Sequence, residues 1–193
     1  MNKNKRLLKK LNAIKGITAK PRDQRADDAP ESIAIDDAAV SRPVMDYLHD
    51  VPSALKPIMG KTLSQLLHER RPGELPTLPT SYPVRHMHEL YDTVVSRFTV
   101  EDVRFLIAQQ TALEEMVPLA MCILEEDILA SGDFYDGDLL QALLRLPDDY
   151  WMSRPAIASM LVKMLKAENN YIAEGIDDKD LQENINRFME RYQ

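Results

Sequence analysis

Hydrophobic residues along most of this chain recur every three or four positions, which is the spacing of an α-helix that buries one face. Helices are predicted over residues 63–67, 82–97, 100–107, 113–129, 139–146, 154–168 and 177–192. No stretch shows the sustained polar and apolar alternation of a β-strand, and no repeat of fixed period occurs. The pattern predicts an all-α fold: a single compact, multi-helix, bundle-like domain with a flexible basic N-terminal extension.

Short polar residues stand before most of these segments, where their side chains can accept from the free N–H groups of a first helical turn. The predicted N-caps are Thr62, Ser81, Thr99, Asp138 and Ser153. Elsewhere the pattern is interrupted. Pro118 predicts a kink or a fresh helix start near Val117, and Gly132 is predicted to be a left-handed C-cap. The three prolines within residues 71–79 predict a surface loop.

The first part of the chain differs from the rest. Residues 1–22 hold eight lysines and arginines and no acid, and residues 18–42 are rich in Pro, Asp, Arg, Ala and Ser. Such a composition buries too little apolar surface to fold alone. We therefore predict a basic extension and linker over residues 1–42 and an α-helical domain over residues 43–193. Leucines at helical spacing within residues 3–17 leave open a short basic amphipathic helix.

The distribution of charge along the chain indicates which kinds of binding partner are favoured. The net charge is −7. Subtracting the eight positive charges of residues 1–22 leaves −15 on residues 23–193. An acidic body repels nucleic acid and attracts basic partners, so we expect no direct nucleic-acid binding by this body. No apolar run is long enough for a membrane span, and no secretory signal follows the basic start, so the expected location is the cytoplasm.

The residues that could bind a metal or act in catalysis do not form a recognisable site in the sequence. His86 and His88 are two apart, which places them about 200° apart around a helix and unable to share a metal. A calcium loop counted from Asp133 would need glycine at its sixth position and glutamate at its twelfth, where Asp138 and Leu144 stand. Cys122 lies in an apolar run and is expected to be a small buried hydrophobe. With no phosphate loop or nucleophile elbow either, we predict no enzyme, no metal and no cofactor.

Three stretches of the chain together carry a resemblance. They are residues 98–109 (FTVEDVRFLIAQ), residues 117–120 (VPLA) with the downstream Leu124, and residues 132–140 (GDFYDGDLL), followed by Leu143, Tyr150 and Trp151. This pattern resembles the helical family of contact-dependent growth inhibition (CDI) immunity proteins, and residues 61–66 (KTLSQL) are similar to that family's opening helix. The family favours glycine where Ala108 and Ala112 stand in this chain.

The resemblance implies a bacterial, cytoplasmic antitoxin that has no catalytic residues. Its partner would be the C-terminal toxin domain of an effector delivered by a neighbouring cell, often a nuclease, and a nuclease that grips phosphate is basic. As candidate contacts we select the acids of residues 125–127 and 133–138 together with two aromatic residues as anchors. They are Glu125, Glu126, Asp127, Asp133, Tyr135, Asp136, Asp138 and Trp151. Asp138 as a cap and Trp151 as a core residue remain competing interpretations.

Two other functions stay open from the sequence. In one, the chain is a helical adaptor or regulator whose basic tail docks on membrane or nucleic acid while the acidic body recruits a protein. In the other, it is a metal-dependent hydrolase that uses Asp133, Asp136 and Asp138.

Overall fold

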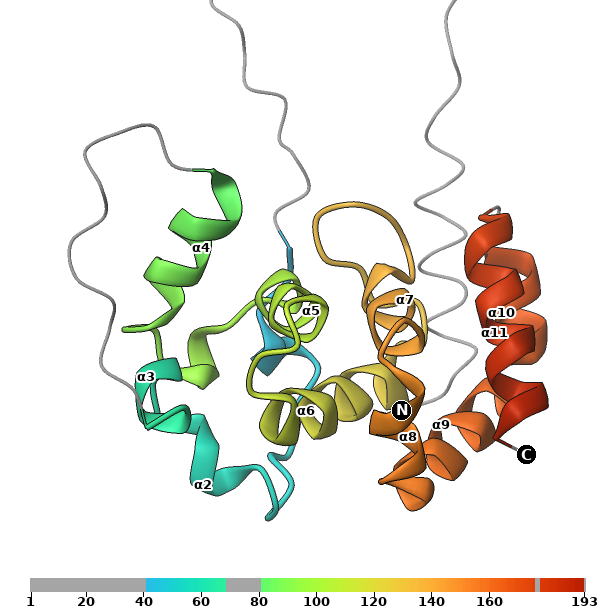
Figure 1. The fold of residues 1–193 in the computed structure, drawn as a ribbon, viewed down its shortest axis with the longest axis horizontal. Coiled ribbons are helices and arrows are strands. Elements are labelled where there is room, and N and C mark those ends of the chain that lie inside the picture. The colour runs from blue at the N-terminus through green and yellow to red at the C-terminus, as the bar shows by residue number, and fades with distance from the viewer. Residues whose placement is uncertain (1–40, 69–80, 176–177, 193) are drawn as a thin grey trace, which may run out of the picture. The chain divides into compact units, whose positions relative to one another are not determined.

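The computed structural model describes residues 41–68, 81–175 and 178–192. Within these ranges the regular elements are all helical and no strand occurs, which confirms the all-α prediction. The predicted N-terminal extension up to residue 40 and the whole of the predicted proline-rich loop at residues 71–79 lie outside the described residues. The elements keep the labels of Figure 1.

The described elements begin with two 3-10 helices interleaved with short α-helices and continue with longer α-helices. They are η1 (Val44–Asp46), α2 (Lys56–Met59), α3 (Leu63–Leu66), α4 (Tyr82–Leu90), η2 (Val95–Arg97), α5 (Val100–Ala108), α6 (Leu113–Glu126), α7 (Asp138–Leu144), α8 (Asp148–Met152), α9 (Pro155–Ala167), α10 (Asn169–Gly175) and α11 (Lys179–Arg191).

Helix α5 is central to the packing, since it contacts both α6 and α7, while α11 contacts α7 and α9 (Figure 1). The sequence explains this position, because apolar residues cover most of the α5 surface. The largest side chains of the core that are almost fully buried are Trp151, Phe98, Leu63, Leu106, Ile107, Met116, Leu119, Met121, Ile123, Leu124, Leu139 and Leu140. Burial of a large aliphatic or aromatic side chain contributes roughly 1.5–3 kcal/mol, so this core dominates the stability.

Two helix starts match the sequence prediction in atomic detail. The Thr99 N–H donates to Asp102 Oδ2 at 2.7 Å, and the Asp102 N–H donates back to Thr99 Oγ1 at 3.2 Å. Thr62 and Gln65 form the same reciprocal pair before α3. Each capping box satisfies N–H groups that a helix start leaves without intrahelical partners.

The other predicted caps differ from expectation. Ser81 holds the N-cap position of α4, but its side chain makes no capping hydrogen bond. Ser153 is wrong as an N-cap, because it closes α8 by donating from Oγ to the Tyr150 carbonyl at 2.8 Å, and Arg154 precedes α9 instead. Proline at the first position of α9 is nevertheless as expected, since its missing N–H costs nothing there.

The helix predicted over residues 82–97 is shorter than expected, because α4 ends at Leu90 and only the short η2 follows. Val94 is extended and pairs with Thr62 in an isolated bridge, and the Val95 N–H donates to the Lys61 carbonyl at 2.9 Å. Hydrogen bonds to a distant segment therefore replace the local helical ones, although the apolar spacing continues.

Helix α6 runs without a break through Pro118, so no new helix begins at Val117. The missing proline N–H removes one hydrogen bond, which the complete burial of the adjoining Val117 and Leu119 offsets. Before this helix Ala112 has a φ of +50°, in the left-handed region that glycine adopts without a steric penalty. The preference of the resembling family for glycine at this position thus has a backbone reason.

The C-terminal region contains one more helix than predicted, since α10 precedes α11. Asp178 caps α11, and its Oδ1 accepts from the N–H groups of Asp180 at 2.8 Å and Leu181 at 3.2 Å. Leu181, Ile185 and Phe188 are buried and form the inner face of α11.

Candidate partner-binding site

The loop between α6 and α7 contains the glycine- and aspartate-rich residues 132–137, and the side chain of Asp138, the first residue of α7, binds back to this loop. Asp138 is only 4% exposed, and its Oδ1 accepts from the Gly132 N–H at 2.6 Å while Oδ2 accepts from the Phe134 N–H at 3.2 Å. Burial raises the pKa of Asp138, and these two N–H donors act in the opposite direction. Asp138 therefore organises the loop rather than capping α7, whose N-cap is Gly137.

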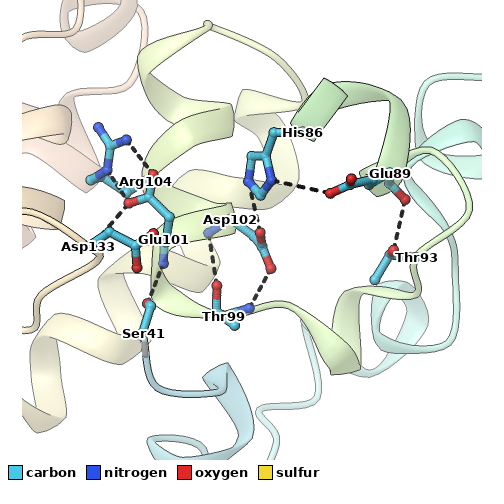
Figure 2. Close-up of polar contacts among 9 residues, drawn as sticks. All are labelled: Ser41, His86, Glu89, Thr93, Thr99, Glu101, Asp102, Arg104 and Asp133. Atoms are coloured by element: carbon cyan, nitrogen blue, oxygen red, sulfur yellow. Dashed lines mark hydrogen bonds and ion pairs between the residues drawn. The ribbon is translucent and has the colours of Figure 1, made fainter. Parts of the chain in front are cut away.

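Helix α5 supplies a second buried acid to the same loop. Glu101 is 3% exposed, and its Oε2 accepts from the Asp133 N–H at 3.2 Å. Both Glu101 oxygens also accept from Arg104, from Nε and from Nη2, at 2.6 Å each (Figure 2). The Ser41 hydroxyl accepts from the Glu101 N–H at 2.8 Å, so the backbone of this turn is also held.

One guanidinium thus serves two buried carboxylates, because Arg104 Nε also lies 3.9 Å from Asp138 Oδ2. We call Glu101, Arg104 and Asp138 the loop-holding triad. Removing a cation from such a group leaves desolvated negative charge, so the three side chains depend on one another. The triad fixes the backbone of residues 132–134 through three hydrogen bonds that side chains of α5 and α7 accept.

The predicted left-handed C-cap at Gly132 is wrong, since its φ is not positive, whereas Gly137 has a φ of +92°. Gly132 is required for a different reason. A Cβ added there would clash with Glu101 Oε2 and lie 3.1 Å from Asp138 Oδ2. The absence of a side chain is what allows both carboxylates of the loop-holding triad to reach this backbone.

The outer side of the loop presents two large aromatic side chains to solvent. Phe134 is 66% exposed and Tyr135 is 40% exposed, and the flanking Asp133 and Asp136 are exposed as well. The Arg104 guanidinium lies 4.6 Å from the centroid of the Phe134 ring. Exposed aromatic residues on a rigid support next to arginine are typical of energetically dominant positions in protein interfaces.

Sequence reasoning missed the residues that hold this surface and one that forms it: Glu101, Arg104 and Phe134. The spacing of Glu101 and Arg104 is a signal for an ion pair on one helix face. Nothing in the local sequence indicates that this pair is buried against a loop more than 30 residues away along the chain. Phe134 stands between predicted contacts, and its placement in a loop already indicated exposure.

The acids at the end of α6 form a separate segment. Glu125 and Glu126 are exposed, and Glu126 Oε2 lies 3.9 Å from His49 Nε2. Asp127 has a local role, because its Oδ1 accepts from the Leu129 N–H at 3.2 Å. A histidine beside Glu126 is the kind of compensating group expected where acids oppose the helix dipole.

Trp151 is buried and cannot contact a partner in this structure. It is 1% exposed, and its ring packs edge-on against Phe188, with 4.9 Å between the centroids. The core interpretation of Trp151 is therefore the one the structure supports. Of the candidate contacts, Trp151 and Asp138 are inaccessible, because neighbouring elements cover them.

His86 of α4 reaches Asp102 of α5, with 3.0 Å between Nε2 and Oδ1 (Figure 2). The Asp102 side chain raises the pKa of His86 above its ordinary value of 6.5, while burial works in the opposite direction. Tyr82 stacks on the His86 ring with 5.2 Å between the centroids. The contact links α4 to the helix that carries the loop-holding triad.

A pH-dependent stability follows from this contact. Because the folded-state pKa of His86 is raised, its stabilising effect is complete below the unfolded-state pKa and is lost as the pH rises through the folded-state value. The melting temperature of the wild type, minus that of His86→Asn, is expected to shrink from about pH 5.5 to about pH 8.5. The exposed His68→Asn serves as the control. A wild-type minus His86→Asn difference that does not change with pH would contradict the prediction.

The structure also bears on the remaining chemical hypotheses. Among the described residues, no three His, Cys, Asp or Glu side chains are grouped so that they could hold a metal ion. The hydrolase hypothesis needs Asp138 as a ligand, yet both of its oxygens accept from backbone N–H groups. Burial raises the pKa of the Cys122 thiol, which disfavours the reactive thiolate. In the part of the chain that is described, no helix has the length and apolar character to cross a membrane.

The loop and the triad lie in a region with known relatives. The family model of the CDI immunity proteins matches residues 72–161, just under half of the chain. The resemblance to the CDI immunity proteins is confirmed. No curated protein and no solved structure matches the chain. The CDI immunity match includes α5 to α8, and so it contains the whole loop-holding triad and the loop with Phe134 and Tyr135.

Proposed function

We propose that this protein is an antitoxin that binds the C-terminal toxin domain of a contact-dependent growth inhibition effector and neutralises it. It does so in the cytoplasm, by covering the toxin and without catalysis. The observation that carries the proposal is the CDI immunity match over residues 72–161. That segment contains the exposed aromatic loop, which gives the proposed activity a physical surface.

The contact surface we propose consists of the accessible candidates at the end of α6 and in the following loop, together with Phe134, which was not among the candidates selected from the sequence. They are Glu125, Glu126, Asp127, Asp133, Phe134, Tyr135 and Asp136. Asp138 and Trp151 are left out because they are buried. The acidic side chains favour a basic toxin domain, of the kind a nuclease would have, since opposite charge speeds the encounter of two proteins. Rapid capture protects a cell because an unbound toxin remains active.

A growth rescue experiment tests the proposal. The protein is produced in cells that make the C-terminal domain of the large exoprotein encoded beside its gene, and survival is scored. Wild type is expected to restore growth. Changing Glu125, Asp133 and Asp136 together to lysine is expected to reduce the association rate by roughly tenfold or more, because it replaces three attractive charges with repulsive ones.

A matched control changes three exposed acids outside the matched region, Glu174, Glu183 and Glu190, to lysine. It has the same net charge as the test variant and is expected to keep most of the association rate. Death of cells that contain abundant, folded wild-type protein would overturn the proposal for this toxin. Equal effects of the two triple variants would remove the α6 end and the loop from the contact surface.

A further inference from the structure

A cavity of about 430 Å³ lies beside the exposed loop, lined by residues of α5 and α7. Its apolar lining comes from Ile107, Ala142 and Leu146, and Phe134 and Tyr135 contribute aromatic surface from the loop. The cavity is large enough for a long side chain of a partner, and its walls belong to packed helices and to the loop that the triad holds. Such a site is already formed before binding, which reduces the entropy lost on association.

The charged side chains that line this cavity differ in how many hydrogen bonds and ion pairs they already form. Asp138 already accepts from two backbone N–H groups, and Arg104 has its Nε and Nη2 bound to Glu101. Arg145, in contrast, is exposed and forms no ion pair with any of the described residues. Of the two arginines in this lining, Arg145 is the one without an anionic partner among the described residues.

The position of Arg145 is nevertheless supported. Gln141, which is 2% exposed, can turn its amide oxygen toward Arg145 and accept from Nη2 at 2.9 Å and from Nε at 3.3 Å. A neutral amide orients the guanidinium without cancelling its charge. An arginine held in this way is suited to a carboxylate, because its planar fork matches two carboxylate oxygens and charge-assisted hydrogen bonds are the stronger kind.

We infer that the α5–α7 cavity receives an acidic side chain of the toxin domain, whose carboxylate pairs with Arg145. The aliphatic stem of that side chain packs on Phe134, Tyr135 and Leu146. The inference rests on the proposed function and deepens it, because it assigns one specific contact within a surface that is otherwise acidic. A general attraction between opposite charges would draw in many basic proteins. Because Arg145 requires a carboxylate in the cavity, a basic protein that presents a lysine at this position is repelled.

The test measures the dissociation constant of the same toxin domain for full-length variants. Arg145→Glu is expected to weaken binding by roughly 30-fold or more, because it places a negative charge against the inserted carboxylate. Arg145→Gln should fall between this variant and the wild type. The control is Arg97→Glu, which makes the same charge change at an exposed arginine of η2, and it should change the dissociation constant less than about threefold.

A charge exchange identifies the partner group. Each Asp and Glu of the toxin domain is changed singly to lysine, and one such variant is expected to bind Arg145→Glu more tightly than it binds wild type. Tighter binding of Arg145→Glu than of wild type to the unchanged toxin would show a basic occupant and overturn the inference. Equal binding of Arg145→Glu and Arg97→Glu would also overturn it while leaving the antitoxin function intact. Absence of wild-type binding would instead overturn the proposed function.

Discussion

Replacing Arg104 with methionine is expected to lower the free energy of unfolding by about 3 kcal/mol. Methionine keeps much of the length and apolar surface of the arginine stem, so the effect isolates the charge. Without the guanidinium, Glu101 and Asp138 remain as two buried carboxylates that have no other cation beside them among the described residues. Chemical denaturation of the two proteins measures the difference, and Arg97→Met, at an exposed site, should change it by less than about 0.5 kcal/mol.

A double variant tests the reason for this loss. If Arg104 acts by compensating buried charge, Arg104→Met should cost less when Glu101 is already glutamine. The double variant should then be more stable, by about 1 kcal/mol or more, than the sum of the single losses predicts. Additive losses would show that the two side chains stabilise the fold independently, which would contradict the triad described above.

Truncating Trp151 to alanine is expected to lower the free energy of unfolding by about 3–5 kcal/mol, the range for a large aromatic residue removed from a core. Trp151 packs against Phe188 of α11 and against Tyr150, so its loss opens a cavity between α8 and the C-terminal helix. Thermal or chemical denaturation measures this loss. The neighbouring Met152 is a matched control, because it is 65% exposed and Met152→Ala should cost less than about 0.5 kcal/mol.

The same variant separates a core residue from an interface anchor. Below its unfolding transition, Trp151→Ala should bind the toxin domain with nearly wild-type affinity, because the ring is covered in the folded protein. A folded Trp151→Ala protein that loses most of its affinity would instead show that the ring reaches the partner. That result would require α8 to rearrange on binding, since no such exposure exists in this structure.

The Arg104 expectations rest on one physical idea, which is that buried charge supports an exposed surface. An isolated loop of this kind would lose much conformational entropy on binding. Here Asp138 and Glu101 hold its backbone before any partner arrives. The stability of the loop-holding triad and the affinity of the loop for a toxin domain are therefore expected to change together when Arg104 is replaced.

Much of the fold was determined by local sequence signals. The capping boxes at Thr62 and Thr99 and the apolar face of α11 involve residues three or four positions apart, and these interactions form wherever the segment becomes helical. The resemblance to the CDI immunity proteins was also carried by the sequence, as the match over residues 72–161 confirms. In all of these, the relevant partners are near neighbours or a pattern of residue types.

Only the tertiary structure decided the features that depend on distant partners. Helix α4 stops at Leu90 because Val94 and Val95 pair with the chain near Thr62, and Asp138 leaves its expected capping role because backbone N–H groups of the loop are within its reach. Gly132 is required by the approach of Glu101 rather than by its own φ. The spacing of residues along the sequence indicates which capping and packing interactions a residue can make within one turn of a helix. Which of those options is realised depends on the hydrogen bonds and charges that folding brings to it from elsewhere, and on the large cost of leaving buried polar groups unpaired.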